Sequence, residues 1–207
     1  MATRKSFWMR NVAIGARMHS GWGALVAVSN DAGAIEIIER RRIIITTPGT
    51  SGGNQPYHFA RSLELPEAEK FLTERFVTSK HLALTAVRDL ADELRERQYH
   101  VIGAAILLAS GRPLPPLLKI LASHALIHAA EGEFFREAFS KACEHLDLPV
   151  TGFQERSLDE YVQATFGKAA TRIWQQISTL GRSLGPPWTR DQKMAALAAL
   201  VVLAKFQ

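Results

Sequence analysis

The chain has 207 residues, of which 47% are hydrophobic and 22% charged, a balance typical of a packed globular protein and not of a disordered chain or a coiled coil. Its formal net charge is +5, and its single cysteine, Cys143, excludes an intramolecular disulfide and a cysteine-rich zinc module. The longest apolar run, residues 194–204, is about half as long as a membrane-spanning helix requires. Arg10 and Arg17 interrupt the apolar stretch that a signal peptide would need. We therefore expect a cytoplasmic protein without a membrane segment.

Basic residues are concentrated near the start of the chain, where residues 1–17 contain no acid. A second basic cluster lies at residues 40–42. Such clusters favour contact with phosphate groups, although a solvated tail that keeps a protein soluble has the same composition. We predict a basic arm over residues 1–11, one domain over residues 12–207, and DNA or RNA as a partner. The candidate contact residues are Arg4, Lys5, Arg10, Arg17, Arg40, Arg41 and Arg42.

The first third of the domain has the composition of a β-meander. Branched residues gather at 24–28, 35–38 and 43–47, with turn-forming residues between the first two segments. No amphipathic pattern of helix length fits between the turns, so two or three antiparallel strands are predicted. Residues 48–57 are rich in glycine, proline and polar residues and indicate a loop.

The remainder alternates between helical and strand patterns. Apolar periodicity predicts helices over residues 66–98 and 117–146. Between them, residues 101–108 are continuously apolar, which is typical of a strand buried on both faces of a sheet. Residues 149–153 predict a further short strand.

The last part of the chain is predicted to be helical. Ser157 with Glu160 three residues later predicts a capping box at the start of one helix, with a break near Gly167. Thr189 is predicted to cap a final helix. Antiparallel opening strands followed by alternating strands and helices predict an α/β fold with one mixed sheet and helices on both faces.

This order of elements resembles the ribonuclease H-like superfamily, and within it the RuvC-type and YqgF-type Holliday-junction resolvases. Four stretches carry the resemblance: the glycine-containing strand Ser20-Gly21-Trp22-Gly23 through Val28, the buried strand and Gly/Pro loop of residues 101–113, Gln154-Glu155-Arg156-Ser157, and the final helix from Asp191. The third is similar to the Asp-Glu-Arg-x-Ser stretch of the family. The fourth is similar to the family helix that begins with a catalytic Asp.

The resemblance implies a site where carboxylates hold two Mg²⁺ or Mn²⁺ ions that bind a scissile phosphate and activate water. Only Glu155 and Asp191 stand at family-like positions. The first-strand acid is expected among residues 18–20 and the central-strand acid among residues 101–110, and neither segment contains one; Gln154 replaces a further Asp. We therefore expect a degenerate acidic site, with Glu155 and Asp191 as the catalytic and metal-binding candidates.

Three further candidate ligands share one face of the helix predicted over residues 117–146. His124, His128 and Glu131 stand at positions i, i+4 and i+7. Two imidazoles and a carboxylate would suit a zinc ion with an open position, and these residues are also candidates to replace the missing acids. The alternative is a buried helix whose histidines are hydrogen-bonded within the fold.

Two functional hypotheses follow. The first is a nucleic-acid-associated ribonuclease H-like protein, in its most specific form a resolvase-like, metal-dependent nuclease with an altered acidic site. The alternative is a non-catalytic scaffold or assembly module that forms homo- or hetero-oligomers through its sheet and the apolar last helix, which contains residues 195–204. The residues leave open whether the chain is an enzyme.

Overall fold

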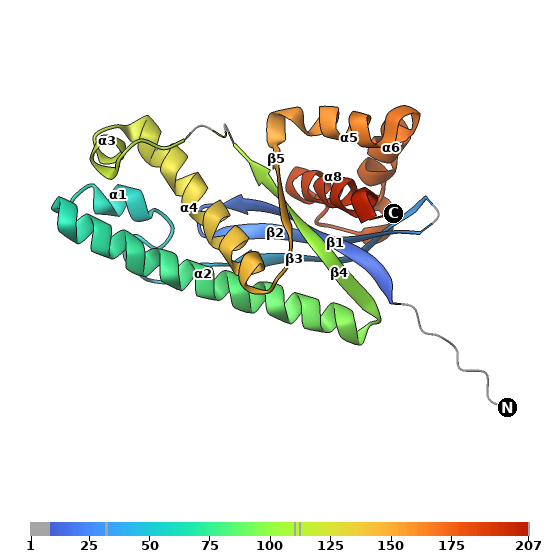
Figure 1. Ribbon diagram of the computed structural model, residues 1–207, viewed down its shortest axis with the longest axis horizontal. Helices are drawn as coiled ribbons and strands as arrows, with labels where there is room; N and C mark the ends of the chain where they lie inside the picture. Colours follow the sequence, from blue (N-terminus) through green and yellow to red (C-terminus); the bar gives the residue numbers. More distant parts are fainter. Residues whose placement is uncertain (1–8, 32, 110, 112, 207) are drawn as a thin grey trace.

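The structure is a computed structural model, which describes residues 9–206 apart from residues 32, 110 and 112. Its centre is a five-stranded sheet in the order β3-β2-β1-β4-β5 (Figure 1). The strands are β1 (Arg10–His19), β2 (Trp22–Asp31), β3 (Ala34–Ile44), β4 (Tyr99–Leu108) and β5 (Val150–Gln154). The first three pair antiparallel, whereas β4 runs parallel to both β1 and β5. The predicted mixed sheet with antiparallel opening strands is therefore confirmed.

The first strand lies earlier in the chain than expected. Residues 20–28, read as the opening strand, form the turn into β2 and most of β2 itself, while β1 spans Arg10–His19. Arg10 and Asn11 thus belong to the central strand of the sheet, although they fall within the predicted basic arm. Arg4 and Lys5 lie outside the described residues.

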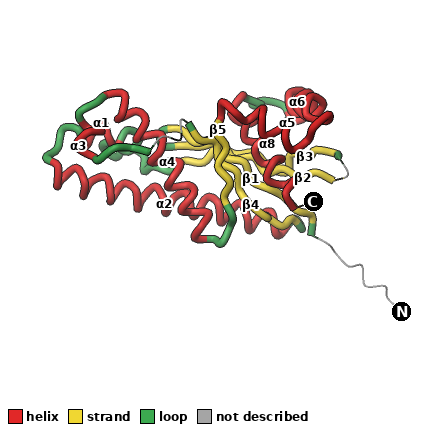
Figure 2. Tube along the Cα trace, turned by 45° about the horizontal axis from the view of Figure 1, so that its top comes forward, coloured by secondary structure: helices red, strands yellow, loops and turns green. Residues whose placement is uncertain are grey.

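Helices cover both faces of the sheet, as predicted. One layer contains α1 (Pro56–Ala60), α2 (Leu65–Glu96), α3 (Leu117–Leu121) and α4 (His124–His145). The other contains α5 (Leu158–Phe166), α6 (Ala170–Thr179), α7 (Gly181–Leu184) and α8 (Arg190–Leu203). Figure 2 shows the two groups of helices separated by the sheet. Short 3-10 turns follow β5 (Glu155–Ser157), α5 (Gly167–Ala169) and α8 (Ala204–Phe206).

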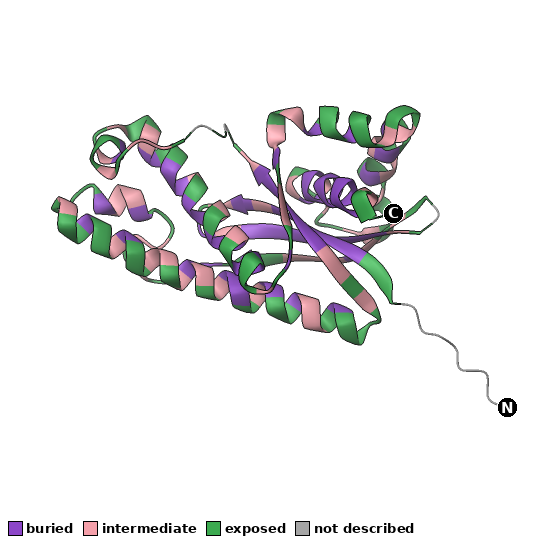
Figure 3. Cartoon of the chain, in the orientation of Figure 1, coloured by how far each residue is buried: buried purple, intermediate pink, exposed green. Residues whose placement is uncertain are grey.

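Each face of the sheet has its own hydrophobic core. Ile14 of β1 packs with Leu90 of α2 and Phe139 of α4 on one face, and Ala13 lies in the core that contains Leu197 of α8 on the other. Alternate residues of β1 therefore enter opposite cores, as the strand geometry requires. Figure 3 shows buried residues gathered in the middle of the sheet and along α8.

Helix α8 is buried along nearly its whole length, from Met194 to Leu203. It packs on β1, β2 and β4, while α5 and α6 contact it as well. Its apolar surface is therefore covered within one chain, so the expected homo- or hetero-oligomer interface on this helix has no free apolar face to use. Among the described residues, no helix has both the length and the hydropathy to cross a membrane.

Of the two predicted helix caps, the one at the start of α5 is absent. Ser157 precedes α5 but its side chain makes no capping hydrogen bond, so the predicted box with Glu160 is wrong. At α8, by contrast, the backbone N–H of Thr189 donates to Oε1 of Gln192 over 2.8 Å. The cap of α8 matters for function because Asp191 stands in its first turn.

Candidate functional site

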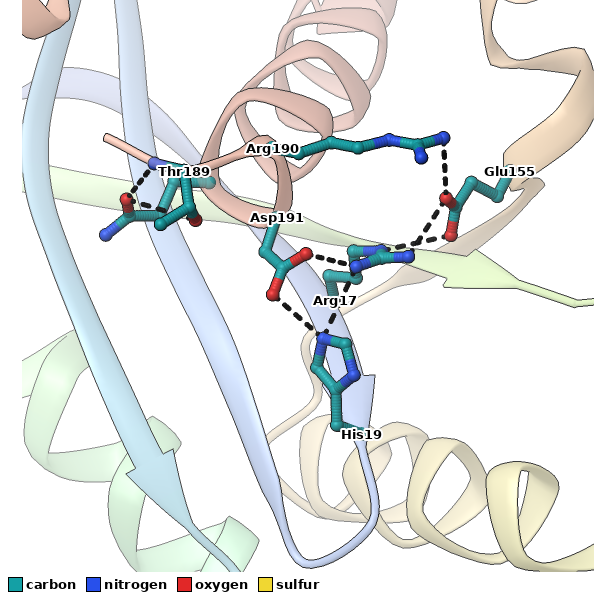
Figure 4. Close-up of polar contacts among 7 residues, drawn as sticks. Arg17, His19, Glu155, Thr189, Arg190 and Asp191 are labelled. Atoms are coloured by element: carbon teal, nitrogen blue, oxygen red, sulfur yellow. Dashed lines mark hydrogen bonds and ion pairs between the residues drawn. The ribbon is translucent and has the colours of Figure 1, made fainter. Parts of the chain in front are cut away.

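The candidate site forms where β1 ends, β5 ends and α8 begins (Figure 4). Arg17 and His19 lie on the same face of β1 as Gly15, because side chains alternate along a strand. A Cβ atom at Gly15 would overlap the carbonyl oxygen of Ala195. The glycine therefore lets α8 approach β1 closely, which places Asp191 of α8 over the end of the strand.

The guanidinium of Arg17 joins two carboxylates. Its Nε and Nη2 donate to Oε2 and Oε1 of Glu155, each over 3.0 Å, which is the bidentate geometry that suits a planar fork. Its Nη1 donates to Oδ1 of Asp191. The side chains of Arg17, Glu155 and Asp191 are 20%, 27% and 20% exposed, so these ion pairs are partly shielded from water.

His19 completes the cluster from the end of β1. Its Nε2 lies 2.9 Å from Oδ2 of Asp191, and its ring stacks on Trp22 with centroids 4.2 Å apart. The guanidinium of Arg42 covers Trp22 at 4.0 Å from the ring centroid. The residues Arg17, His19, Glu155 and Asp191 are called the Arg17 cluster below.

The charge of Arg17 is fixed by its neighbours. Burial lowers the pKa of Arg17, but the hydrogen bond and negative charge of Glu155 and the charge of Asp191 outweigh it and raise the pKa above its ordinary value. The guanidinium therefore stays protonated at any physiological pH. It supplies a permanent positive charge between the two carboxylates.

This donor set does not fit the two Mg²⁺ or Mn²⁺ ions that the resemblance implies. Glu155 and Asp191 are brought together as expected, yet both already bind a cationic side chain. The β1 side chain that reaches them is Arg17, where a two-metal site would need another carboxylate. A divalent ion at the same place would have to displace the guanidinium and face its charge.

An open groove of about 410 Å³ borders the Arg17 cluster. Glu155 lines it together with two exposed arginines, a lysine and a tryptophan, namely Arg156, Arg190, Lys193 and Trp174. Asp159 and Met194 complete the lining. Sequence reasoning missed this basic and aromatic groove because its residues come from three separate segments of the chain.

Most of the predicted phosphate-binding arginines have partners within the fold. Arg10 donates to Glu36 over 2.5 Å, and Arg41 donates to Glu93 over 2.5 Å. Arg40 donates to backbone carbonyls at the end of α7 and just after it, those of Leu184, Gly185 and Pro187. Together with Arg17 and the stacked Arg42, these side chains hold structural elements together, and their role in binding nucleic acid stays a prediction.

The predicted ligands of the long helix form a second cluster. His124, His128 and Glu131 all lie on α4, and His58 of α1 joins them. Among the described residues, the contacts of this group are with one another and not with Glu155 or Asp191. The structure therefore does not bring them into the Arg17 cluster as replacements for the missing acids.

Comparison with solved structures supports the fold assignment. The structure of RuvC from Thermus thermophilus superimposes with a TM-score of 0.53 at 12% identity, covering 94% of this chain and 95% of that one. T. thermophilus RuvC in complex with a Holliday junction substrate gives a TM-score of 0.52 at 12% identity, covering 94% of each chain. No protein-family model and no curated protein matches the sequence.

The chain therefore has a ribonuclease H-like fold. Its arrangement is similar to that of T. thermophilus RuvC over 94% of the chain.

Proposed function

We propose that this protein binds nucleic acid in the groove beside Glu155 without cutting it by a two-metal mechanism. The observation that carries the proposal is the guanidinium of Arg17, which donates to both Glu155 and Asp191. A two-metal site would require further negative charge beside Glu155 and Asp191. Arg17 supplies positive charge there instead.

The groove offers the chemistry that nucleic acid requires. Arg156 and Lys193 can neutralise phosphates, the interaction that dominates the affinity of most nucleic-acid-binding proteins; Arg190, which lies 3.4 Å from Oε1 of Glu155, borders the same groove. Trp174 lines the same groove and offers an aromatic face for base stacking. One of the similar structures is a complex of RuvC with a Holliday junction substrate, so a branched DNA is the first ligand to test.

The binding test compares labelled four-way junction, duplex DNA, single-stranded DNA and single-stranded RNA by fluorescence anisotropy at several salt concentrations. Arg156→Ala/Lys193→Ala is expected to weaken binding about 10-fold and to reduce the salt dependence by roughly one to two counterions. Lys70→Ala/Arg88→Ala removes the same charge from α2, in the helical layer on the other face of the sheet, and is expected to change affinity less than about 2-fold. Equal losses in both variants, or no salt-dependent binding by the wild type, would contradict the proposal.

The cleavage test incubates the same substrates with Mg²⁺ and, separately, Mn²⁺. We expect binding without metal-dependent cleavage, because the acidic pair is occupied by Arg17. Mn²⁺-dependent cleavage that Asp191→Asn abolishes would instead support the metal-dependent nuclease hypothesis. Binding and cleavage are separate readouts, so either half of the proposal can fail alone.

A further inference from the structure

We propose that His58, His124 and His128 form a binding site for a transition-metal ion, with Zn²⁺ the best match, at the junction of α1 and α4. One ligand atom from each histidine lies within 4.8 Å of the other two. The Nε2 atoms of His124 and His128 are 3.1 Å apart. Nitrogen ligands of a tetrahedral zinc ion, each about 2.0–2.1 Å from the metal, lie about 3.3 Å from one another. Small side-chain movements would therefore complete the site.

The local fold explains why these three rings meet. His124 is the first residue of α4 and His128 follows one helical turn later, so both side chains lie on the same helix face. The short helix α1 packs against α4 and brings His58 to that face. The ring centroid of His58 lies 5.3 Å from that of His124 and 4.8 Å from that of His128.

In this site Glu131 orients the ligand His58, whereas the sequence predicted Glu131 to be a metal ligand itself. Its side chain is 3% exposed, and Oε1 accepts the backbone N–H of His58 over 3.1 Å. The same oxygen lies 2.9 Å from Nδ1 of His58. An Nδ1–H that donates to this carboxylate leaves Nε2 of His58 free to bind metal. A carboxylate that orients a metal-binding imidazole in this way is a frequent feature of zinc sites.

The burial of the Glu131 carboxyl group gives a second reason for a cation at this place. An ionised carboxylate is costly to bury unless positive charge or hydrogen bonds compensate it. His58 provides the contacts to Glu131, and a metal ion on the far side of the His58 ring would strengthen the Nδ1–H donor. The site would thus add positive charge next to a carboxylate that the fold already buries.

The coordination would be incomplete with protein ligands alone. Three imidazoles leave one tetrahedral position for water or an anionic group, which is typical of catalytic zinc sites and not of closed structural ones. His124 and His128 are exposed, and His58 also lines an open groove of about 680 Å³ with Ser20 and Asn54. A small exogenous ligand can therefore reach this cluster from solvent.

The test uses the full chain without a histidine tag, freed of metal by dialysis against a chelator. Zn²⁺ is titrated in competition with a chromophoric chelator, and Co²⁺ replaces it for visible spectroscopy. We expect one equivalent of Zn²⁺ and a Co²⁺ absorption band of tetrahedral type. Weak binding with no defined stoichiometry, or a Co²⁺ spectrum identical to that of the hydrated ion, would overturn the proposal.

Variants identify the ligands. His58→Ala, His124→Ala and His128→Ala are each expected to weaken Zn²⁺ binding at least about 100-fold, and Glu131→Gln about 10- to 100-fold. His145→Ala is the matched control because His145 is an exposed histidine at the end of the same helix, and it should leave the affinity unchanged.

Circular dichroism of each metal-free variant separates loss of ligands from loss of fold. Any variant that fails to fold is replaced by the corresponding Asn substitution. Unchanged affinity in folded His58 and His128 variants, or an equal loss in His145→Ala, would also overturn the proposal. The result is independent of the nucleic-acid proposal, because neither Arg17 nor the groove beside Glu155 takes part.

Discussion

Arg17 donates to Glu155 through Nε and Nη2 and to Asp191 through Nη1, so one guanidinium satisfies two partly buried carboxylates. These partners are 138 and 174 residues away in the sequence. The resemblance placed Glu155 and Asp191 in one site, and the structure brings them together. The resemblance could not reveal the cation between them. An arginine near the start of a chain looks the same in the sequence whether its side chain faces solvent or an acidic pair.

Loss of this cation should destabilise the fold. Arg17→Met leaves two carboxylates close together with reduced compensation, and we expect the free energy of unfolding to fall by about 2 kcal/mol. Arg10→Met on the same strand is the control. Arg10 pairs with Glu36 at the surface, where the two side chains are 42% and 51% exposed, so its loss should cost less than about 1 kcal/mol. Urea denaturation measures both, and equal effects would show that Arg17 acts as an ordinary surface residue.

Strands β4 and β1 show why one buried strand can be predicted from the sequence and another cannot. Residues 101–108 are uniformly apolar and were predicted as a buried strand, which became most of β4. Strand β1 has an equally buried centre from Val12 to Ala16. Its sequence does not look like a buried strand, because Arg10, Arg17 and His19 interrupt the apolar residues. The small residues Ala13 and Gly15 on one face are explained only by the close approach of α8, which no local pattern encodes.

That close approach gives a prediction for the contact between β1 and α8. Gly15→Ala would place a methyl group against the backbone of Ala195, and rigid backbone cannot move aside as a side chain can. We expect a loss of about 3 kcal/mol. At Gly103 of β4 the added Cβ would meet a methyl group of Val202 at 3.2 Å and the carbonyl oxygen of Pro149 at 3.3 Å. At Gly15, by contrast, it would overlap the oxygen of Ala195. For Gly103→Ala we therefore expect a loss of about 1 kcal/mol. Thermal or urea denaturation should rank the two, and the reverse order would refute the packing argument.

The two cores on opposite faces of the sheet raise the question of whether they unfold together. Cys143 lies in the core beneath α2 and α4, whereas α8 lies in the other. Both cores are built on strands β1, β2 and β4, whose alternate residues enter one core or the other, so loss of one core removes packing that supports the sheet beneath the other. We infer that the molecule unfolds as one unit.

Cys143 reports on this coupling. Burial raises the pKa of Cys143 to about 12, so the native thiol stays protonated while an unfolded chain ionises it above about pH 9; rising pH in that range therefore favours unfolding. We expect iodoacetamide at pH 8 to modify the native chain at least about 100-fold more slowly than the unfolded chain.

Truncation after Thr189, which removes α8, should make Cys143 react at the unfolded rate although the cysteine lies on the other face. Truncation after Ala204 removes the exposed Lys205 and Phe206 together with the last residue of the chain and should leave the thiol protected. A protected thiol in the chain without α8 would mean that the two layers are independent.

The edge strands of the sheet are β3 and β5, and neither is suited to pairing with a strand of another molecule. β3 carries charged residues at 36 and 39–42, and the register of β2 and β3 shifts beside Val28; charges and bulges of this kind discourage intermolecular β-pairing and aggregation. β5 is only five residues long. Widening of the sheet by strand addition is therefore disfavoured, which leaves the strand ends and the helical layers as the surfaces where other molecules can attach.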